Sequence, residues 1–176
     1  MELTKKERTI KYITFAVVIL AAALCQNVLS PHLEIGGARC FILLPAAVML
    51  GINEDEKLAA LYGLFAGALC DMVSAQTRGF HCIYIMTACY IASALVTFIF
   101  RSTFWYQLIC AVLTVIFFCL LYWLLFVFIG GGEGSAYMLL RFYLPSALYT
   151  IALSPFVYLL LKPLGEKLNK IEKIAD

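Results

Sequence analysis

Few side chains in this chain can do chemistry inside an apolar segment, and the most prominent of them is Asp71. It follows Ala59, Gly63 and Gly67 at intervals of four residues, so a helix would present all four on one face. A lone carboxylate can accept hydrogen bonds or pair with a cation, whereas the proton-sharing pair of an intramembrane aspartyl protease requires two. The apolar segments contain no second acidic residue, so this pattern predicts packing and recognition.

Other catalytic and binding motifs are missing from the sequence. There is no Gly-x-Ser-x-Gly motif, and the glycine run that ends at Ser135 lacks the Gly-Lys-Ser/Thr ending of a phosphate-binding loop. No Cys-x-x-Cys pair is present, and His81, at the start of an apolar run, is typical of an interfacial or hydrogen-bonded histidine. We therefore predict a protein that is not an enzyme and holds no metal or cofactor.

The cysteines are predicted to be free thiols. Their number is odd, and most lie inside apolar runs, where a thiol behaves as a small apolar side chain. They are Cys25, Cys40, Cys70, Cys82, Cys89, Cys110 and Cys119.

The composition places these residues in a membrane protein. Of 176 residues, 64% are hydrophobic and only 14% are charged, which excludes disordered, nucleic-acid-binding and ordinary soluble classes. The net charge of +2 indicates no electrostatic partner. A helix needs about 20 apolar residues to cross the bilayer core, so the chain is long enough for six or seven spans at most. No large domain outside the membrane is expected.

We predict an all-α integral membrane protein with a single domain over residues 1–176. The first apolar run has no cleavage pattern after it and is interpreted as a retained span rather than a signal peptide. Residues 36–73 form a hairpin of two short spans, with a re-entrant hairpin as the alternative. The six predicted spans are 12–29, 36–52, 57–73, 79–100, 106–129 and 142–161.

The basic residues set the orientation of these spans. Ten of them lie on the side of the termini and three on the other, which predicts cytoplasmic termini in a multi-pass protein. The first group is Lys5, Lys6, Arg8, Lys11, Lys57, Arg101, Lys162, Lys167, Lys170 and Lys173, and the second is Arg39, Arg78 and Arg141.

The stretch from Gly63 to Ser74, followed by Arg78-Gly79-Phe80-His81, resembles the signature of the rod shape-determining protein MreD family. In that family a glycine-spaced helix ends in Asp, and a short turn leads into the next helix. The resemblance implies a non-enzymatic scaffold subunit of the bacterial elongation complex (elongasome) in the cytoplasmic membrane, which controls rod shape and lateral peptidoglycan synthesis. The implied partners are MreC directly and, in the wider complex, MreB, the SEDS glycosyltransferase and the class B transpeptidase.

The predicted fold also resembles that of the S components of energy-coupling factor vitamin transporters, and such a component is the alternative function. A vitamin site needs several polar groups in one outward pocket. The candidates are Gln26, Asn27, His32, Glu34, Gln76, His81, Glu133 and Arg141.

Two structural predictions concern the Asp71 region. The face formed by Ala59, Gly63, Gly67 and Asp71, with Gly79 and His81 beyond it, is predicted to be a helix-packing or partner interface that tolerates alanine at the glycines but not leucine. Asp71 and Arg39 stand at a similar height of about 20 Å above the turn of the hairpin, which predicts an ion pair between them. Arg78 and Arg141 are the alternative partners.

Overall fold

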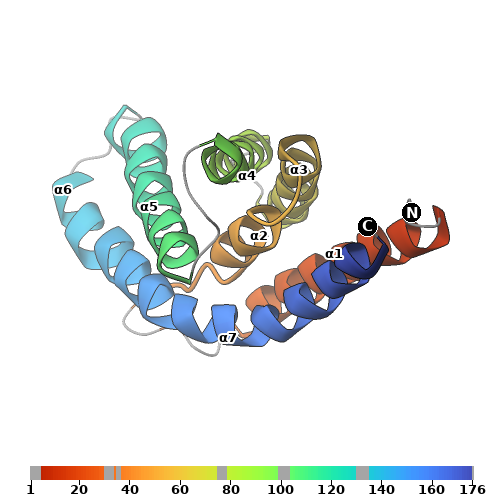
Figure 1. Cartoon of the computed structure of the whole chain (residues 1–176). Helices are drawn as coiled ribbons and strands as arrows, with labels where there is room; N and C mark the ends of the chain where they lie inside the picture. Colours follow the sequence, from red (N-terminus) through yellow and green to blue (C-terminus); the bar gives the residue numbers. More distant parts are fainter. Residues whose placement is uncertain are drawn as a thin grey trace.

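The computed structural model of the chain describes residues 5–29, 34, 37–74, 79–98, 104–129 and 135–175. Helices dominate these ranges, and Figure 1 shows their arrangement. The elements are α1 (Lys5–Leu29), α2 (Leu43–Gly51), α3 (Glu56–Val73), α4 (Phe80–Phe98), α5 (Phe104–Tyr122), the π-helical η1 (Trp123–Phe128), α6 (Ser135–Met138), the π-helical η2 (Leu139–Tyr143) and α7 (Leu144–Ala175).

Four helical segments are long and apolar enough to cross a membrane. They are Thr9–Val28, Phe80–Thr97, Phe104–Phe128 and Ala136–Pro163, and each overlaps a span predicted from the sequence. The nine residues of α2 reach only about 13 Å, less than half of a bilayer core. The 18 residues of α3 are less apolar, because they include Glu56, Lys57 and Asp71.

The short helix α2 forms the centre of the molecule. All nine of its residues are buried, and it contacts α1, α3, α4, α5 and α7. Around it, Phe15, Ile19, Ala59, Ile85 and Val115 contribute to the hydrophobic core, each at most 2% exposed. A helix surrounded in this way is apolar on every face, as the run Leu43 to Gly51 is.

The chain before α2 is not helical, although the predicted span began at residue 36. Gly37 has φ +92°, and a Cβ there would collide with the Phe142 ring. The amides of Arg39 and Phe41 donate to Ser146 Oγ and Thr150 Oγ1 of α7, at 3.0 and 3.1 Å. Two residues of extended chain advance about 6.6 Å and four residues of helix about 6 Å, so the two spacings match. Because these amides bind α7, the helix begins only at Leu43.

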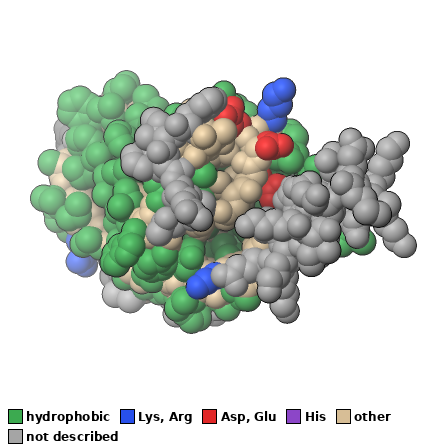
Figure 2. All heavy atoms as spheres, in the orientation of Figure 1, with side chains coloured by type: hydrophobic (Ala, Val, Ile, Leu, Met, Phe, Trp, Pro, Cys, Tyr) green, Lys and Arg blue, Asp and Glu red, His purple; other side chains and the backbone are tan. Residues whose placement is uncertain are grey.

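The outside of the molecule is apolar. Figure 2 shows hydrophobic side chains over most of the described surface on one face, with the visible acidic side chains close together near α3. Large exposed side chains recur along α1, α5 and α7, for example Val17, Phe117 and Phe156 at 56%, 57% and 60% exposure. A surface of this kind is stable when lipid surrounds it.

Helices α4 and α5 stand apart, with an apolar groove of about 640 Å³ between them. Two tyrosines bridge the gap in opposite directions. Tyr84 of α4 donates its hydroxyl to the Thr114 carbonyl at 2.6 Å, and Tyr106 of α5 donates to the Ala92 carbonyl at 3.0 Å. Each hydroxyl donates to a backbone carbonyl of the other helix, so the two tyrosine side chains set the distance between α4 and α5.

Candidate functional site

The glycine-spaced face of α3 packs directly on α4. A Cβ built on Gly63 would lie 2.6 Å from the Ile85 carbonyl oxygen, and one on Gly67 would lie 2.6 Å from the Cys82 nitrogen. The two backbones are therefore as close as small residues allow. Gly67 lies against Cys82, and Gly63, one turn earlier in α3, lies against Ile85 and Met86, one turn later in α4. The two helices are therefore antiparallel. The face is an internal packing interface.

This close contact corrects the expectation that alanine would be tolerated at the two glycines. The atoms that a new methyl group would meet belong to the α4 backbone, which cannot rotate away as a flexible side chain can. Ala59 continues the face and is fully buried. Near it a Cβ on Gly51 of α2 would contact Ala59 Cβ at 3.3 Å and Cys89 Cβ at 3.5 Å, so here three helices meet.

Helix α4 begins without a capping side chain of its own. Gly79, with φ +87°, precedes the first helical residue, and its carbonyl accepts the Ile83 amide at 3.2 Å. Gly79 is thus the N-cap residue, and a positive φ suits glycine there. An N-cap side chain normally accepts a hydrogen bond from the second or third helical amide, and glycine offers none.

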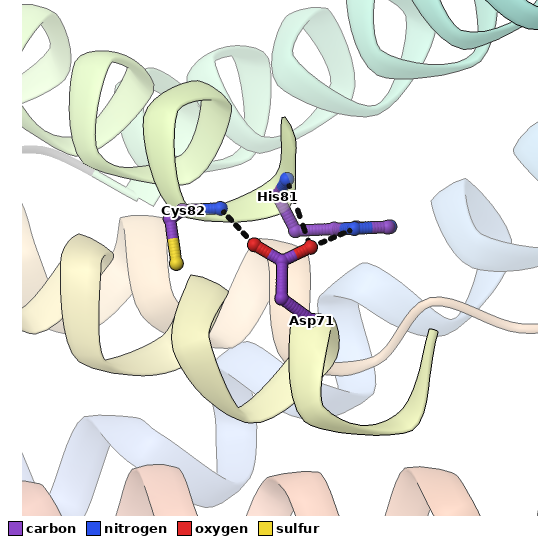
Figure 3. A network of polar contacts seen from close by, with 3 residues as sticks. All are labelled: Asp71, His81 and Cys82. Atoms are coloured by element: carbon purple, nitrogen blue, oxygen red, sulfur yellow. Dashed lines mark hydrogen bonds and ion pairs between the residues drawn. The ribbon is translucent and has the colours of Figure 1, made fainter. Parts of the chain in front are cut away.

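Asp71 of α3 supplies that missing cap from the neighbouring helix (Figure 3). Its Oδ1 accepts from the His81 amide at 3.3 Å, and its Oδ2 accepts from the Cys82 amide at 3.0 Å. These are the second and third amides of α4, which are the two that an N-cap side chain would satisfy. Gly67 lies one turn before Asp71, and the close approach that it permits brings the short carboxylate within reach.

The His81 ring completes the arrangement. Its Nδ1 lies 2.8 Å from Asp71 Oδ1, and the side chains of His81 and Asp71 are only 8% and 11% exposed. An ionised carboxylate only accepts hydrogen bonds, so Nδ1 carries the proton. The positive end of the α4 dipole also favours the negative charge. Asp71 is therefore a partly buried charge that two backbone amides and an imidazole stabilise.

A small pocket with both polar and apolar walls lies next to this cap, between the ends of α1 and α3 and the start of α4. Its volume is about 140 Å³. Its polar lining comes from Gln26, Asn27, Arg39, Ser74 and His81, and Phe118 is part of its apolar wall. Among the described residues, no group of three His, Cys, Asp or Glu side chains is placed to hold a metal ion.

The sequence signature around this site agrees with a known family. The family model of the rod shape-determining protein MreD matches residues 6–164, which covers most of the chain and includes both Asp71 and His81. The chain belongs to the MreD family. No curated protein and no solved structure matches it.

Membership of the MreD family assigns the protein to rod shape determination, and the four apolar helices fit a membrane protein. The likeness to energy-coupling factor S components has no support, because no solved structure of that fold matches. The pocket is also small for a vitamin, since pockets for drug-sized ligands hold about 300 to 1,000 Å³. Of the residues proposed for a vitamin site, His32, Gln76 and Glu133 lie outside the described residues.

The predicted ion pair between Asp71 and Arg39 is wrong, and each residue has another partner. The structure joins Asp71 to His81, whereas Arg39 Nε lies 3.7 Å from Glu34 Oε1. Within the described part of the chain no ion pair links Arg39 to Asp71. Of the alternative partners, Arg141 is exposed in η2, and Arg78 lies outside the described residues. The height argument assumed a helix from residue 36, but Arg39 lies in the extended segment before α2.

The structural roles of several residues were not predicted from the sequence. Gln26 Oε1 accepts the Leu43 amide at 2.9 Å, so α2, like α4, is capped by a side chain from a neighbouring helix. At the other end of α3, Lys11 Nζ and Glu54 Oε1 form a buried ion pair at 2.7 Å. The nearest sequence signal was a polar residue close to the end of a span, as Gln26 and Lys11 are. All seven cysteines, each within the described ranges, are free thiols.

Proposed function

We propose that this protein is a non-enzymatic membrane scaffold of the elongation complex, which organises lateral peptidoglycan synthesis together with MreC. The observation that carries the proposal is the family match over residues 6–164. MreB, the SEDS glycosyltransferase and the class B transpeptidase belong to the wider complex in this proposal. Both termini are cytoplasmic in a protein that crosses the membrane several times.

The contacts of the intramembrane polar groups support a scaffold rather than a catalyst. Asp71, Gln26 and Ser93 each bind a backbone group of another helix or turn. Non-helical backbone and helix ends need such partners wherever lipid excludes water. These side chains hold the fold together, and a nucleophile or general base would need freedom to reach a substrate.

The groove between α4 and α5 offers a surface for a partner that crosses the membrane once, as MreC does in this family. Tyr84 and Tyr106 hold α4 and α5 apart, and the groove lining is apolar apart from Tyr84, Thr87 and Thr114. Thr87 is exposed there, and its hydroxyl bonds within its own helix to the Ile83 carbonyl at 2.7 Å. In this proposal the membrane helix of MreC lies along the groove.

A substitution at Thr87 tests the function and the surface together. Thr87→Phe fills the groove without touching the core, so less MreC should co-purify and cells that rely on the variant should become round. Ala152→Phe is the matched control, because Ala152 is exposed on α7, outside the groove.

Depletion of the protein separates the two parts of the proposal. If depleted rods keep their width, the scaffold function is wrong. If depletion rounds the cells but Thr87→Phe binds MreC as well as the Ala152→Phe control does, only the groove assignment is wrong.

A further inference from the structure

We propose that the pocket beside the Asp71 cap binds a phosphate group, which Arg39 and Gln26 hold where α1, the extended segment and α3 meet. The pocket and the groove between α4 and α5 are distinct sites with different linings. Nothing in the scaffold function requires a small ligand, so the two proposals stand or fall separately.

The size of the pocket selects a small group. A cavity of about 150 Å³ holds a molecule as large as benzene, and this pocket measures about 140 Å³. A phosphate group has five heavy atoms and fits this space. A vitamin or a nucleotide does not fit, although a larger molecule could place its phosphate here and leave the remainder outside.

The polar lining is rich in hydrogen-bond donors. The Gln26 amide oxygen accepts from the Leu43 amide, which leaves the two donor hydrogens of its NH₂ group for other partners, and the Cys70 thiol in the pocket wall is one of these. Arg39 adds a guanidinium with up to five N–H donors, and two of them can grip two oxygens of one phosphate. Asn27 and Ser74 complete a lining that suits an acceptor-only ligand.

The charges favour an anion as well. Among the described residues that line the pocket, Arg39 carries the formal charge, whereas Asp71 lies outside the lining and its carboxylate accepts hydrogen bonds from two backbone amides and the His81 ring. The Arg39 side chain is 66% exposed, and its contact with Glu34 is long, at 3.7 Å. A phosphate that entered the pocket would compete with Glu34 for this guanidinium.

The same chemistry has two sources, a free phosphate ion or the headgroup of an anionic lipid. Thermal unfolding of the purified full-length protein in a neutral detergent tests both. The arms are inorganic phosphate, sodium chloride at equal ionic strength, bicelles with phosphatidylglycerol and bicelles with phosphatidylcholine only. We expect a saturable rise in Tm of about 3 to 6 °C at ten times the dissociation constant, with phosphate or with phosphatidylglycerol.

Three variants assign the effect to the pocket. Arg39→Gln should abolish the rise, whereas Arg141→Gln, the matched exposed arginine outside the pocket, should leave it unchanged. Glu34→Gln removes the competing carboxylate and should shift the half-saturating concentration down by about threefold or more.

The arm that raises Tm identifies the source of the phosphate. A rise with inorganic phosphate alone indicates the free ion, and a rise with phosphatidylglycerol alone indicates a headgroup. The proposal is overturned if neither probe exceeds its control, or if Arg39→Gln and Arg141→Gln respond to the probe alike.

Discussion

A carboxylate lies at each end of α3, Glu54 buried and Asp71 partly buried, and the two are stabilised in different ways. Before the first turn, Glu54 meets the Lys11 ammonium at 2.7 Å, with side chains 4% and 9% exposed. At the last turn, Asp71 meets the His81 and Cys82 amides and the His81 ring. Glu54 is paired with a side chain of α1, a helix that is distant in sequence. Asp71 is stabilised mainly by backbone amides of α4, the next helix along the chain.

This difference between the two carboxylates determines whether a second substitution can compensate for the loss of each one. A side-chain partner can be removed or exchanged together with the carboxylate, so the two positions of an ion pair can change together. Backbone amides remain whatever the sequence, and they require an acceptor nearby. Glu54 can therefore be replaced if Lys11 is replaced with it. Asp71 has no such compensating change, because the first amides of α4 still need an acceptor.

The largest effect is expected at the ion pair. Lys11→Met or Glu54→Gln alone should lower the free energy of unfolding by about 3 to 5 kcal/mol, because each leaves a buried charge without its partner. The double variant should recover most of this loss, since no isolated charge remains. Thermal unfolding of the four proteins in one detergent gives the comparison.

Tyr62 offers a control near the same pair. It packs edge to face on Phe15 with ring centroids 5.4 Å apart, so Tyr62→Phe keeps the aromatic contact and both charges. It should cost less than either single ion-pair variant. Additive losses in the Lys11 and Glu54 double variant would show that the two ends do not differ as described.

A smaller effect is expected at the cap. Asp71→Ala should cost about 2 to 3 kcal/mol, because two partly buried amides lose their acceptor. Asp71→Asn should cost less, since its amide oxygen still accepts one of the two hydrogen bonds. Exchanging charges with Arg39, as Asp71→Arg with Arg39→Asp, should give no recovery, because an arginine cannot accept from the α4 amides.

Hydrogen exchange locates the effect of the cap variants. The loss of protection in Asp71→Ala should concentrate in the first turn of α4, whereas Glu54→Gln should leave that turn protected. Recovery of stability by the charge exchange would instead establish the arginine pair that the sequence suggested.

The sequence was sufficient to predict the four long apolar helices but not how polar groups pair between helices. Apolar length located the four helices that are long and apolar enough to cross a membrane, and spacing by four selected Gly63 and Gly67, which both lie against the α4 backbone. The partner of Asp71 was not predictable in the same way. Every residue has a backbone amide, so amides leave no signal in a sequence, whereas an arginine is conspicuous.

The extended segment before α2 shows the same limit. Arg39 and Phe41 lie in a segment that was predicted to be helical from its apolar character. Their amides instead bind Ser146 and Thr150, more than 100 residues away. Hydroxyls four residues apart in an apolar helix are ordinary by themselves, because each can bond back to its own helix. Only the tertiary contact shows that they also support another segment.

The smallest of the three effects should arise at the glycine that lets the cap form. Gly67→Ala places a methyl group against the Cys82 and His81 backbone, so α3 and α4 must separate, at a cost of about 1 to 3 kcal/mol. Gly165→Ala is the matched control, since a Cβ there meets nothing within 4 Å and alanine favours a helix. Separation also moves Asp71 away from its amides, so Gly67→Ala and Asp71→Ala should be less than additive, with a coupling of at least about 0.5 kcal/mol. If the two losses simply add, the close approach and the cap are independent, and the end of α3 does not work as a unit.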